Sequence, residues 1–403
     1  MNHSGLFSKI WPVVVAFTMA ALHLATPGNE ALAEDQLATK VTLQRTPEDG
    51  IQPQAVVDEK GTIHLIYFKG EAIAGDVFYV RSADGGAAWS TPLRVNSQQG
   101  SVIATGTVRG AQIALGKNNR VHVSWNGSSV AQPKSKDKTE PLLYARLNDA
   151  GDAFEEQRNL VTWASEIDGG GTLAADAKGN VFVFWHANAG VTEEADRAVF
   201  MARSSDEGST FGRETKINPD ATGACACCQM RALIGKDGAL YVLYRAAGNN
   251  ENRDATLLVS RDGGEKFSSA VLDKWKLMAC PMSTFALAQG TDKTAPILAA
   301  WETEQQVYGS TITPAATLQI SPPVAAPDKG QNRKHPALAT NNRGEVLWTW
   351  TEGTGWARGG SLSWQVYDAE SKPLMKKGRE DGVPVWGLPT AVALPDGNFV
   401  LIY

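Results

Sequence analysis

The stretch that decides the fold is MRALIGKDGALYVLY, residues 230–244, in which two apolar segments flank a turn that ends in glycine. Apolar residues that alternate on either side of an Asp-Gly turn predict a β-hairpin. The same unit occurs four more times, as PQAVVDEKGTIHLIY (53–67), GTLAADAKGNVFVFW (171–185), PALATNNRGEVLWTW (336–350) and PTAVALPDGNFVLIY (389–403). In all five copies the turn glycine stands six residues before a closing tyrosine or tryptophan.

Two looser copies fill the remaining intervals, AQIALGKNNRVHVSW (111–125) and FALAQGTDKTAPILAAW (285–301), and the closing aromatic residues recur every 49 to 60 positions. A repeat of this length holds about four short strands, which is one blade of a β-propeller. A closed ring also avoids the exposed strand edges of an open solenoid. The sequence therefore predicts an all-β propeller of four-stranded antiparallel blades, with seven blades favoured. The segment ATKVTLQRT (38–46) is expected to add a strand to the last blade and close the ring.

A second motif, out of phase with the hairpins, has the form Ser-x-Asp-x-Gly-x-x-aromatic. It occurs as SADGGAAW (82–89), SSDEGSTF (204–211) and SRDGGEKF (260–267), and LNDAGDAF (147–154) is a copy that lacks the serine. The aspartate of such a turn can cap backbone N–H groups, and the glycine supplies the unusual backbone angles. Asp84, Asp206 and Asp262 are therefore expected to hold turns rather than to act as catalytic acids.

These motifs resemble the Asp-box, or bacterial neuraminidase repeat, of the sialidase-like propellers. Sialidases have six blades, so the resemblance keeps six as the alternative blade number. It also implies an active-site arginine, glutamate and tyrosine for an exo-acting glycoside hydrolase of the sialidase type. This chain has Ile51 in the place of that arginine and Gln229 in the place of the glutamate, and the tyrosine nucleophile is missing. The resemblance thus implies the fold without the sialidase reaction, which needs these groups.

A catalytic interpretation stays open as an alternative. The family also places an arginine after the hairpin of a middle blade, and Arg245 stands there. Together with Arg109 and Arg231 it could clamp an anionic group, with Glu302 as acid or base.

The four cysteines are unevenly distributed. Cys225, Cys227 and Cys228 lie within TGACACCQMRAL (222–233), and Cys280 follows some fifty residues later. In sialidase-like blades the innermost strand starts at the active-site face, and these cysteines directly precede the innermost strands of the fourth and fifth hairpin units. We therefore expect all four sulfurs to lie near one another beside the central axis. Their positions relative to the repeated strands place further potential metal ligands on that face: Met230, Met282, His186 and His335.

Three interpretations of the cysteines compete. An even number of thiols in an exported protein predicts two disulfides, with one bond joining neighbouring blades. Thiolates with methionine and histidine nearby suit a soft metal, either copper or zinc. Thiol redox chemistry is the third, and it is least favoured because the motif lies in no thioredoxin-like unit.

The N-terminus predicts export. Lys9 precedes the apolar run IWPVVVAFTMAALHLA (10–25), and Ala31-Leu32-Ala33 has the pattern of a cleavage site. Residues 1–33 are therefore interpreted as a signal peptide and 34–403 as a single propeller domain, periplasmic or secreted, without a membrane span. The formal net charge is −5 without a basic cluster, which makes nucleic acid a poor partner.

The sequence as a whole predicts an exported binding propeller, with a cysteine site that holds a soft metal or is shaped by disulfides. The alternatives are the glycoside hydrolase described above and a protein-binding scaffold. The expected ligand of the axial face is accordingly a metal, a glycan or a protein.

Overall fold

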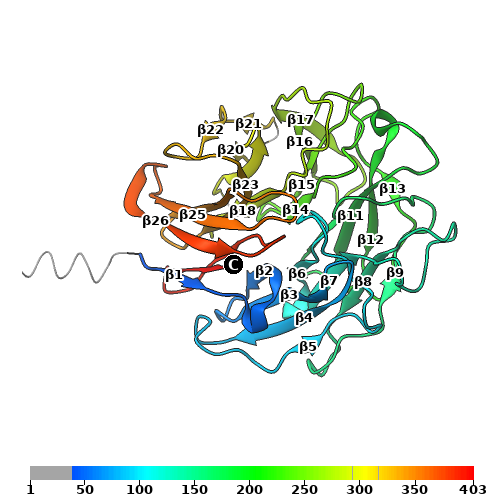
Figure 1. Cartoon of the computed structure of the whole chain (residues 1–403), viewed down its shortest axis with the longest axis horizontal. Helices are drawn as coiled ribbons and strands as arrows, with labels where there is room; N and C mark the ends of the chain where they lie inside the picture. Colours follow the sequence, from blue (N-terminus) through cyan, green and yellow to red (C-terminus); the bar gives the residue numbers. More distant parts are fainter. Residues whose placement is uncertain (1–38, 293, 316) are drawn as a thin grey trace, which may run out of the picture. The chain divides into compact units, whose positions relative to one another are not determined.

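Each of the seven predicted hairpins forms the two innermost strands of a separate sheet, and the sheets follow one another around a central axis (Figure 1). The computed structural model describes residues 39–403 except 293 and 316, and Lys40–Tyr403 forms one compact unit. The chain is a seven-bladed β-propeller, so the prediction of seven blades is confirmed over six. The expected signal peptide, residues 1–33, lies outside the described residues.

Blades 1 to 4 are regular four-stranded antiparallel sheets. Blade 1 consists of β2 (Ile51–Val57), β3 (Ile63–Glu71), β4 (Ala74–Ser82) and β5 (Leu93–Arg94). Blade 2 consists of β6 (Gln112–Leu115), β7 (Val121–Asn126), β8 (Leu142–Arg146) and β9 (Arg158–Asn159). Blade 3 consists of β10 (Thr172–Ala175), β11 (Val181–Ala187), β12 (Ala198–Ser204) and β13 (Thr215–Lys216). Blade 4 consists of β14 (Arg231–Ile234), β15 (Leu240–Arg245), β16 (Ala255–Ser260) and β17 (Ser268–Asp273).

Blades 5 to 7 depart from this pattern at their outer edges. Blade 5 consists of β18 (Phe285–Gln289), β19 (Ile297–Thr303), β20 (Gln306–Thr313) and an outer strand in two pieces, β21 (Gln319–Ile320) and β22 (Val324–Ala325). Blade 6 consists of β23 (Arg333–Thr340), β24 (Val346–Glu352), β25 (Gly360–Tyr367) and the long β26 (Pro373–Val383). Blade 7 has only β27 (Thr390–Ala393) and β28 (Phe399–Ile402) of its own. Three short 3₁₀ helices complete the described elements: η1 (Pro47–Asp49), η2 (Lys117–Asn119) and η3 (Glu194–Asp196).

The N-terminal strand closes the ring as predicted. β1 (Val41–Gln44) pairs with β28 in register, from Val41 opposite Phe399 to Gln44 opposite Ile402. The pairing is parallel, so blade 7 has three strands and ends in a parallel edge (Figure 1).

The turns of the five regular hairpins and of the blade 2 hairpin each contain a residue with a left-handed backbone conformation, that is, with positive φ. In the five regular copies this residue is the predicted glycine, with φ between 77° and 93°. In the looser blade 2 copy Asn119 takes the same place with φ 58°, a conformation that asparagine tolerates better than most residues.

Apolar side chains fill the space between the blades. One buried cluster lies at each of the seven blade interfaces, including the one between blades 7 and 1. The closing aromatic residues of all seven hairpins are buried, with Trp185 and Trp301 fully inaccessible. Within the described residues no helix is long and apolar enough to cross a bilayer.

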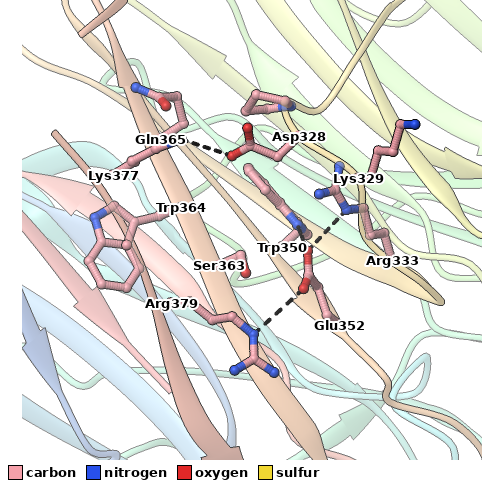
Figure 2. Close-up of a pocket in the computed structure, with 12 residues that line it drawn as sticks. Asp328, Lys329, Arg333, Trp350, Glu352, Ser363, Trp364, Gln365, Lys377 and Arg379 are labelled. Atoms are coloured by element: carbon pink, nitrogen blue, oxygen red, sulfur yellow. Dashed lines mark hydrogen bonds and ion pairs between the residues drawn. The ribbon is translucent and has the colours of Figure 1, made fainter. Parts of the chain in front are cut away.

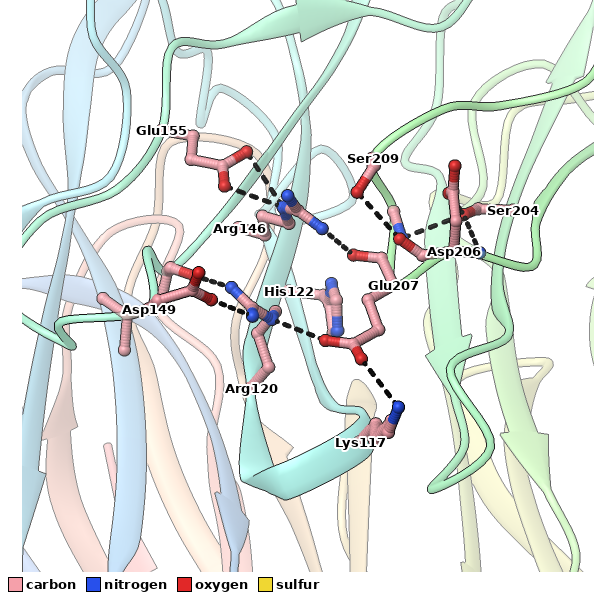
Figure 3. A network of polar contacts seen from close by, with 12 residues as sticks. Lys117, Arg120, His122, Arg146, Asp149, Glu155, Ser204, Asp206, Glu207 and Ser209 are labelled. Carbon is pink, nitrogen blue, oxygen red and sulfur yellow. Dashed lines mark hydrogen bonds and ion pairs between the residues drawn. The ribbon is translucent and has the colours of Figure 1, made fainter.

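The predicted Asp-box aspartates hold their turns. Asp206 accepts hydrogen bonds from the Ser204 hydroxyl (2.7 Å) and from the Thr210 backbone N–H (2.9 Å), and the Ser204 bond leads the effects that lower its pKa to about 2. The turn also joins neighbouring blades, because the carboxylate of Glu207 pairs with Arg120 (3.1 Å) and Lys117 (3.3 Å) of blade 2 (Figure 3). The Asp-box at Ser204–Phe211 therefore has a structural role: it stabilises its own turn and links blade 3 to blade 2.

Substituting Asp206→Ala should lower the free energy of unfolding by about 1 kcal/mol, the usual cost of losing a side-chain cap. The turn would lose three hydrogen bonds to Asp206 while the neighbouring apolar core stays intact. Urea denaturation followed by tryptophan fluorescence measures the difference. Asp220→Ala is the matched control, because Asp220 is exposed and, among the described residues, its side chain pairs with Lys216 alone. Equal effects of the two substitutions would contradict the assigned role.

Candidate metal centre

Three of the four cysteines meet in one tight turn between β13 and β14. The Cys228 N–H donates to the Cys225 carbonyl (3.4 Å), which folds the chain back over Ala226 and Cys227. As a result the Cys225 sulfur lies 3.2 Å from that of Cys228 and 3.7 Å from that of Cys227. All three side chains are buried, and their sulfurs lie within 4.8 Å of one another. The four cysteines are free thiols in the structure.

Three blades hold this turn in place. Cys225 donates its N–H to the carbonyl of Arg245 in blade 4 (2.9 Å), and Gln229 donates to the carbonyl of Ser283 before blade 5 (3.0 Å). Gly169, before blade 3, donates to the Ala226 carbonyl (2.5 Å). A Cβ atom at Gly169 would lie 2.1 Å from the Cys228 carbonyl oxygen, so only glycine permits this close approach. The cluster is therefore fixed at the junction of blades 3, 4 and 5.

A positive charge and a hydroxyl group face Cys228. The Cys228 sulfur lies 3.5 Å from the Ser283 hydroxyl, and that hydroxyl accepts a hydrogen bond from Arg245 Nε (3.2 Å). Burial alone would raise the pKa of Cys228, but its contacts with Cys225 and Cys227 and the charge of Arg245 hold it well below its usual value. The pKa of Cys227 is raised by its contacts with the two other cysteines and by burial. The three sulfurs thus share one stabilised thiolate, centred on Cys228.

A second cation approaches from the other side of the turn. Arg253 is buried and its guanidinium pairs with the carboxylate of Glu194. That carboxylate also accepts the N–H of Ala226 (2.9 Å). Burial acts against the charge of Arg253, yet its interactions with Cys225 and Glu194 raise its pKa. Contact with Cys227 lowers the pKa of Cys225, but contact with Cys228 and burial raise it well above its usual value, so the cluster favours a single sulfur anion.

The other predicted sulfur ligands have different positions. Cys280 is exposed and lines a small cavity of about 110 Å³ together with Met282 and His335. Met282 packs directly against the buried cysteines and has a left-handed backbone with φ 50°. Met230 points into the apolar core between blades 3 and 4. Of the four cysteine sulfurs that we expected in one group, three lie together. Cys280 lies apart from them, and Met282 is the residue that packs beside the three.

The two predicted histidines are buried and neutral. His186 donates from Nε2 to the Cys228 carbonyl (3.0 Å), and burial lowers its pKa to about 4. Its Nδ1 has no hydrogen-bond partner among the described residues. His335 Nδ1 lies 3.2 Å from the Thr284 hydroxyl, and burial lowers the pKa of His335 to about 3. Neither histidine belongs to the group of ligand atoms within 4.8 Å that the cysteines form.

The residues of the catalytic interpretation are already bonded to protein atoms. Arg245 is buried between the rings of Trp275 and Phe285 and donates to two backbone carbonyls. Arg109 pairs with Asp168. These bonds leave Arg245 without the free face that a substrate clamp needs.

Arg231 and Glu302 complete the predicted catalytic set. Arg231 donates to Gln112, and burial lowers its pKa to about 10. Glu302 is buried, and the loss of solvation raises its pKa. Its Oε2 has no partner among the described residues, and Oε1 accepts from the backbone of Gln305 (3.1 Å). Glu302 therefore lies inside the protein rather than on an open cleft.

Sequence reasoning missed three residues that shape the cluster: Ser283, Arg253 and Glu194. They lie outside the repeated hairpin strands, and two of them come from blades other than that of the cysteine turn. Only the nearness of Ser283 to Cys280 and Met282 in the chain was a usable signal.

Known structures share this fold at low sequence identity. An α-L-arabinanase of Penicillium chrysogenum, solved with arabinobiose, has a TM-score of 0.55 at 13% identity and covers 83% of this chain and 99% of its own. A Hadza microbial sialidase has a TM-score of 0.51 at 11% identity, with 82% and 74% covered. A protein of unknown function from Dyadobacter fermentans has a TM-score of 0.51 at 14% identity, with 78% and 94% covered.

No protein-family profile matches the chain, and no functionally curated protein matches it in sequence. The chain thus shares its β-propeller fold with this sialidase and this arabinanase.

Proposed function

We propose that the chain is a metal-binding propeller whose turn of Cys225, Cys227 and Cys228 holds one Cu(I) ion. The observation that carries the proposal is the convergence of three buried sulfurs within 4.8 Å. Thiolates are the ligands that Cu(I) prefers. Thiol ligands lose protons when they bind a metal, and the low pKa of Cys228 makes its sulfur the first ligand for the ion.

The donor set favours Cu(I) over Zn(II). A structural zinc site is closed by four ligands, usually cysteine and histidine. Among the described residues no further cysteine, histidine, aspartate or glutamate joins the three sulfurs. The nearest further donor type is the thioether of Met282, which contacts the cluster and suits Cu(I) better than zinc.

The surface supplies a route to the buried cluster. Cys280 and Met282 line the same small cavity, and Met282 separates that cavity from the three cysteines. A Cu(I) ion can therefore pass from the exposed Cys280 thiol to Met282 and then to the cluster without leaving sulfur ligands. In this arrangement Cys280 and Met282 deliver the ion and the three buried cysteines retain it.

The direct test is an anaerobic titration of the reduced protein with Cu(I) in the presence of bicinchoninate, a coloured chelator that competes for the ion. We expect one Cu(I) per chain to be withdrawn from the chelator. Zn(II) measured in the same way against a zinc indicator should bind more weakly. A protein that leaves all of the Cu(I) with the chelator would contradict the proposal.

Ser283→Ala should weaken Cu(I) binding by about 10-fold, the usual cost of losing a group that supports a metal ligand. The substitution removes the hydroxyl between Arg245 and Cys228, so the pKa of the Cys228 thiol should rise. Thiolate absorbance at 240 nm, recorded against pH, measures the rise. The exposed Ser269 supplies the control Ser269→Ala, which should change neither quantity. An unchanged affinity in Ser283→Ala would remove this residue from the site.

Thiol redox chemistry is the second candidate, because the geometry gives it a specific support. Cys225 and Cys228 have C-x-x-C spacing and sulfurs 3.2 Å apart. Their oxidation by an exogenous disulfide would release two protons and pass two electrons to that disulfide. Thiol titration of the denatured protein decides: four thiols after treatment with oxidised glutathione would exclude it, and two would support it.

A sialidase reaction is not expected. Gln229 cannot take up a proton, and Arg245 is bonded within the protein. The protein should release no fluorophore from 4-methylumbelliferyl N-acetylneuraminate above the blank. Release that is lost in an Arg109→Gln variant would contradict this expectation.

Export is part of the same proposal, on the basis of Lys9, the apolar run 10–25 and the Ala31–Ala33 cleavage pattern. Intact-mass analysis of the protein from the periplasm of an expression host should show a chain that begins at Glu34. A chain of full mass in the cytoplasmic fraction would contradict export.

A further inference from the structure

A polar cavity opens between blades 5 and 6, where the outer strand of blade 5 is divided. β21 and β22 are only two residues each, whereas β26 of blade 6 has 11 residues and reaches beyond them. The segment 327–329 forms the opposite wall, and β23, β24, β25 and β26 form the rest (Figure 2). The cavity has a volume of about 390 Å³, which lies within the range of about 300–1,000 Å³ that is common for small-molecule sites.

Cations outnumber anions in the wall. Four positive side chains, Lys329, Arg333, Lys377 and Arg379, face two carboxylates, Asp328 and Glu352. Both carboxylates are already engaged. Glu352 accepts hydrogen bonds from Arg333 Nε and Trp350 Nε1, each at 3.0 Å, and Asp328 pairs with Lys377 at 3.0 Å (Figure 2). Arg379 is engaged as well, by Asp381 outside the wall (2.9 Å) and by the Ser361 hydroxyl (2.6 Å), so an excess of one positive charge remains for a ligand.

Two nearly buried groups have spare hydrogen-bonding capacity toward the cavity. Arg333 is 2% exposed, and among the described residues its Nη2 has no hydrogen-bond partner. Ser363, 6% exposed, lies in the middle of the wall (Figure 2), and the described part of the chain offers its hydroxyl no partner. Both groups are accessible from the cavity and can therefore bond a polar molecule in it, water included.

We propose that this cavity binds a small carboxylated sugar. The carboxylate would accept hydrogen bonds from Arg333 Nη2 and from Arg379, whose exposed guanidinium would exchange its bonds to Asp381 and Ser361 for the ligand. Ser363 Oγ and Gln365 Oε1 would bond the sugar hydroxyls, because Gln365 Nε2 already donates to the backbone carbonyls of Val366 and Leu374. Trp364 offers an apolar ring face. The site is independent of the cysteine cluster, because none of its lining residues belongs to the residues that hold the cluster.

The test uses isothermal titration calorimetry of the whole protein with three probes: methyl β-D-glucuronide, methyl β-D-glucoside and inorganic sulfate. The two glycosides differ only in the carboxylate. We expect the glucuronide to bind with one molecule per chain, and the neutral glucoside to bind at least 10-fold more weakly, because a charge-assisted hydrogen bond contributes about that factor. Sulfate should compete only weakly, since it lacks the hydroxyl groups.

Paired variants locate the site. Arg379→Gln and Lys377→Gln should each weaken glucuronide binding by about 10-fold. Lys376→Gln is the matched control, because Lys376 neighbours Lys377 on β26 but does not line the cavity, and its affinity should equal that of the wild type. Far-ultraviolet circular dichroism and the melting temperature confirm that each variant is folded.

Three outcomes would overturn the proposal. Equal binding of glucuronide and glucoside would show that the carboxylate is not recognised. If sulfate bound as tightly as the glucuronide, the cavity would recognise negative charge alone and not a sugar. Glucuronide affinity that falls equally in the Lys376→Gln control would place the ligand elsewhere.

Discussion

Replacing both Cys225 and Cys228 by serine should weaken Cu(I) binding by at least about 100-fold, more than the loss of a supporting group costs. The two residues supply two of the three clustered sulfurs, and Cys228 carries the stabilised thiolate. A serine hydroxyl at these positions cannot replace them, because it stays protonated and is a poor ligand for Cu(I). Competition with bicinchoninate measures the loss.

Cys280→Ser is the matched control for this experiment. Cys280 is exposed and lies outside the cluster, so its removal should leave the equilibrium affinity within about threefold while it slows loading. Intact binding in the Cys225→Ser/Cys228→Ser variant, with loss in Cys280→Ser, would show that the exposed thiol holds the ion and would refute the buried site.

The second large effect concerns Glu214, a buried carboxylate in blade 3. Its Oε1 accepts three consecutive backbone N–H groups, those of Thr162, Trp163 and Ala164, at 2.8 to 2.9 Å. Its Oε2 accepts the Thr162 hydroxyl at 2.5 Å. Glu214→Ala would leave these donors without their acceptor, so the free energy of unfolding should fall by about 3 kcal/mol or more. Urea unfolding at pH 7 measures the change.

The same carboxylate should make stability depend on pH. Burial opposes its charge, but the hydrogen bonds from Thr162 and the backbone lower the pKa of Glu214 below its ordinary 4.5. A group with a lowered folded pKa stabilises the fold above its unfolded pKa, and this contribution is lost as the pH falls through the folded value. The advantage of the wild type over Glu214→Gln, which has no acid group, should therefore shrink below about pH 4.5. A constant difference from pH 7 to pH 3 would contradict the assignment.

The fold could be predicted from the sequence because its signal is local. Each hairpin encodes its own alternation and its own left-handed turn residue, and Gly238 or Gly397 can be found without knowledge of the other blades. The outer strands carry no such signal, since β5, β9 and β13 have only two residues each. The parallel direction of β1 was not predictable either, because the alternation of a strand does not depend on its direction.

The candidate site was predictable only in part. The hairpin repeat correctly placed Cys225, Cys227 and Cys228 just before β14. This placement needs only the distance along the chain from a strand that the repeat already identifies. Whether Cys280 or Met282 faces the cluster depends on the backbone angles of an irregular segment, which no repeat specifies. Arg253 and Glu194 act through contacts between blades, and such contacts leave no pattern in a single sequence.

The pairing of β1 with β28 also bears on how the protein is made. Residues 41–44 leave the ribosome early and must wait for a partner some 358 positions later, between Phe399 and Ile402. Until translation has passed Ile402 the growing chain keeps two unpaired sheet edges, which are sites of misassembly in any β-rich polypeptide. The nascent protein should therefore depend on chaperones that hold it open, and closure of the ring should be a late and slow event in its biogenesis.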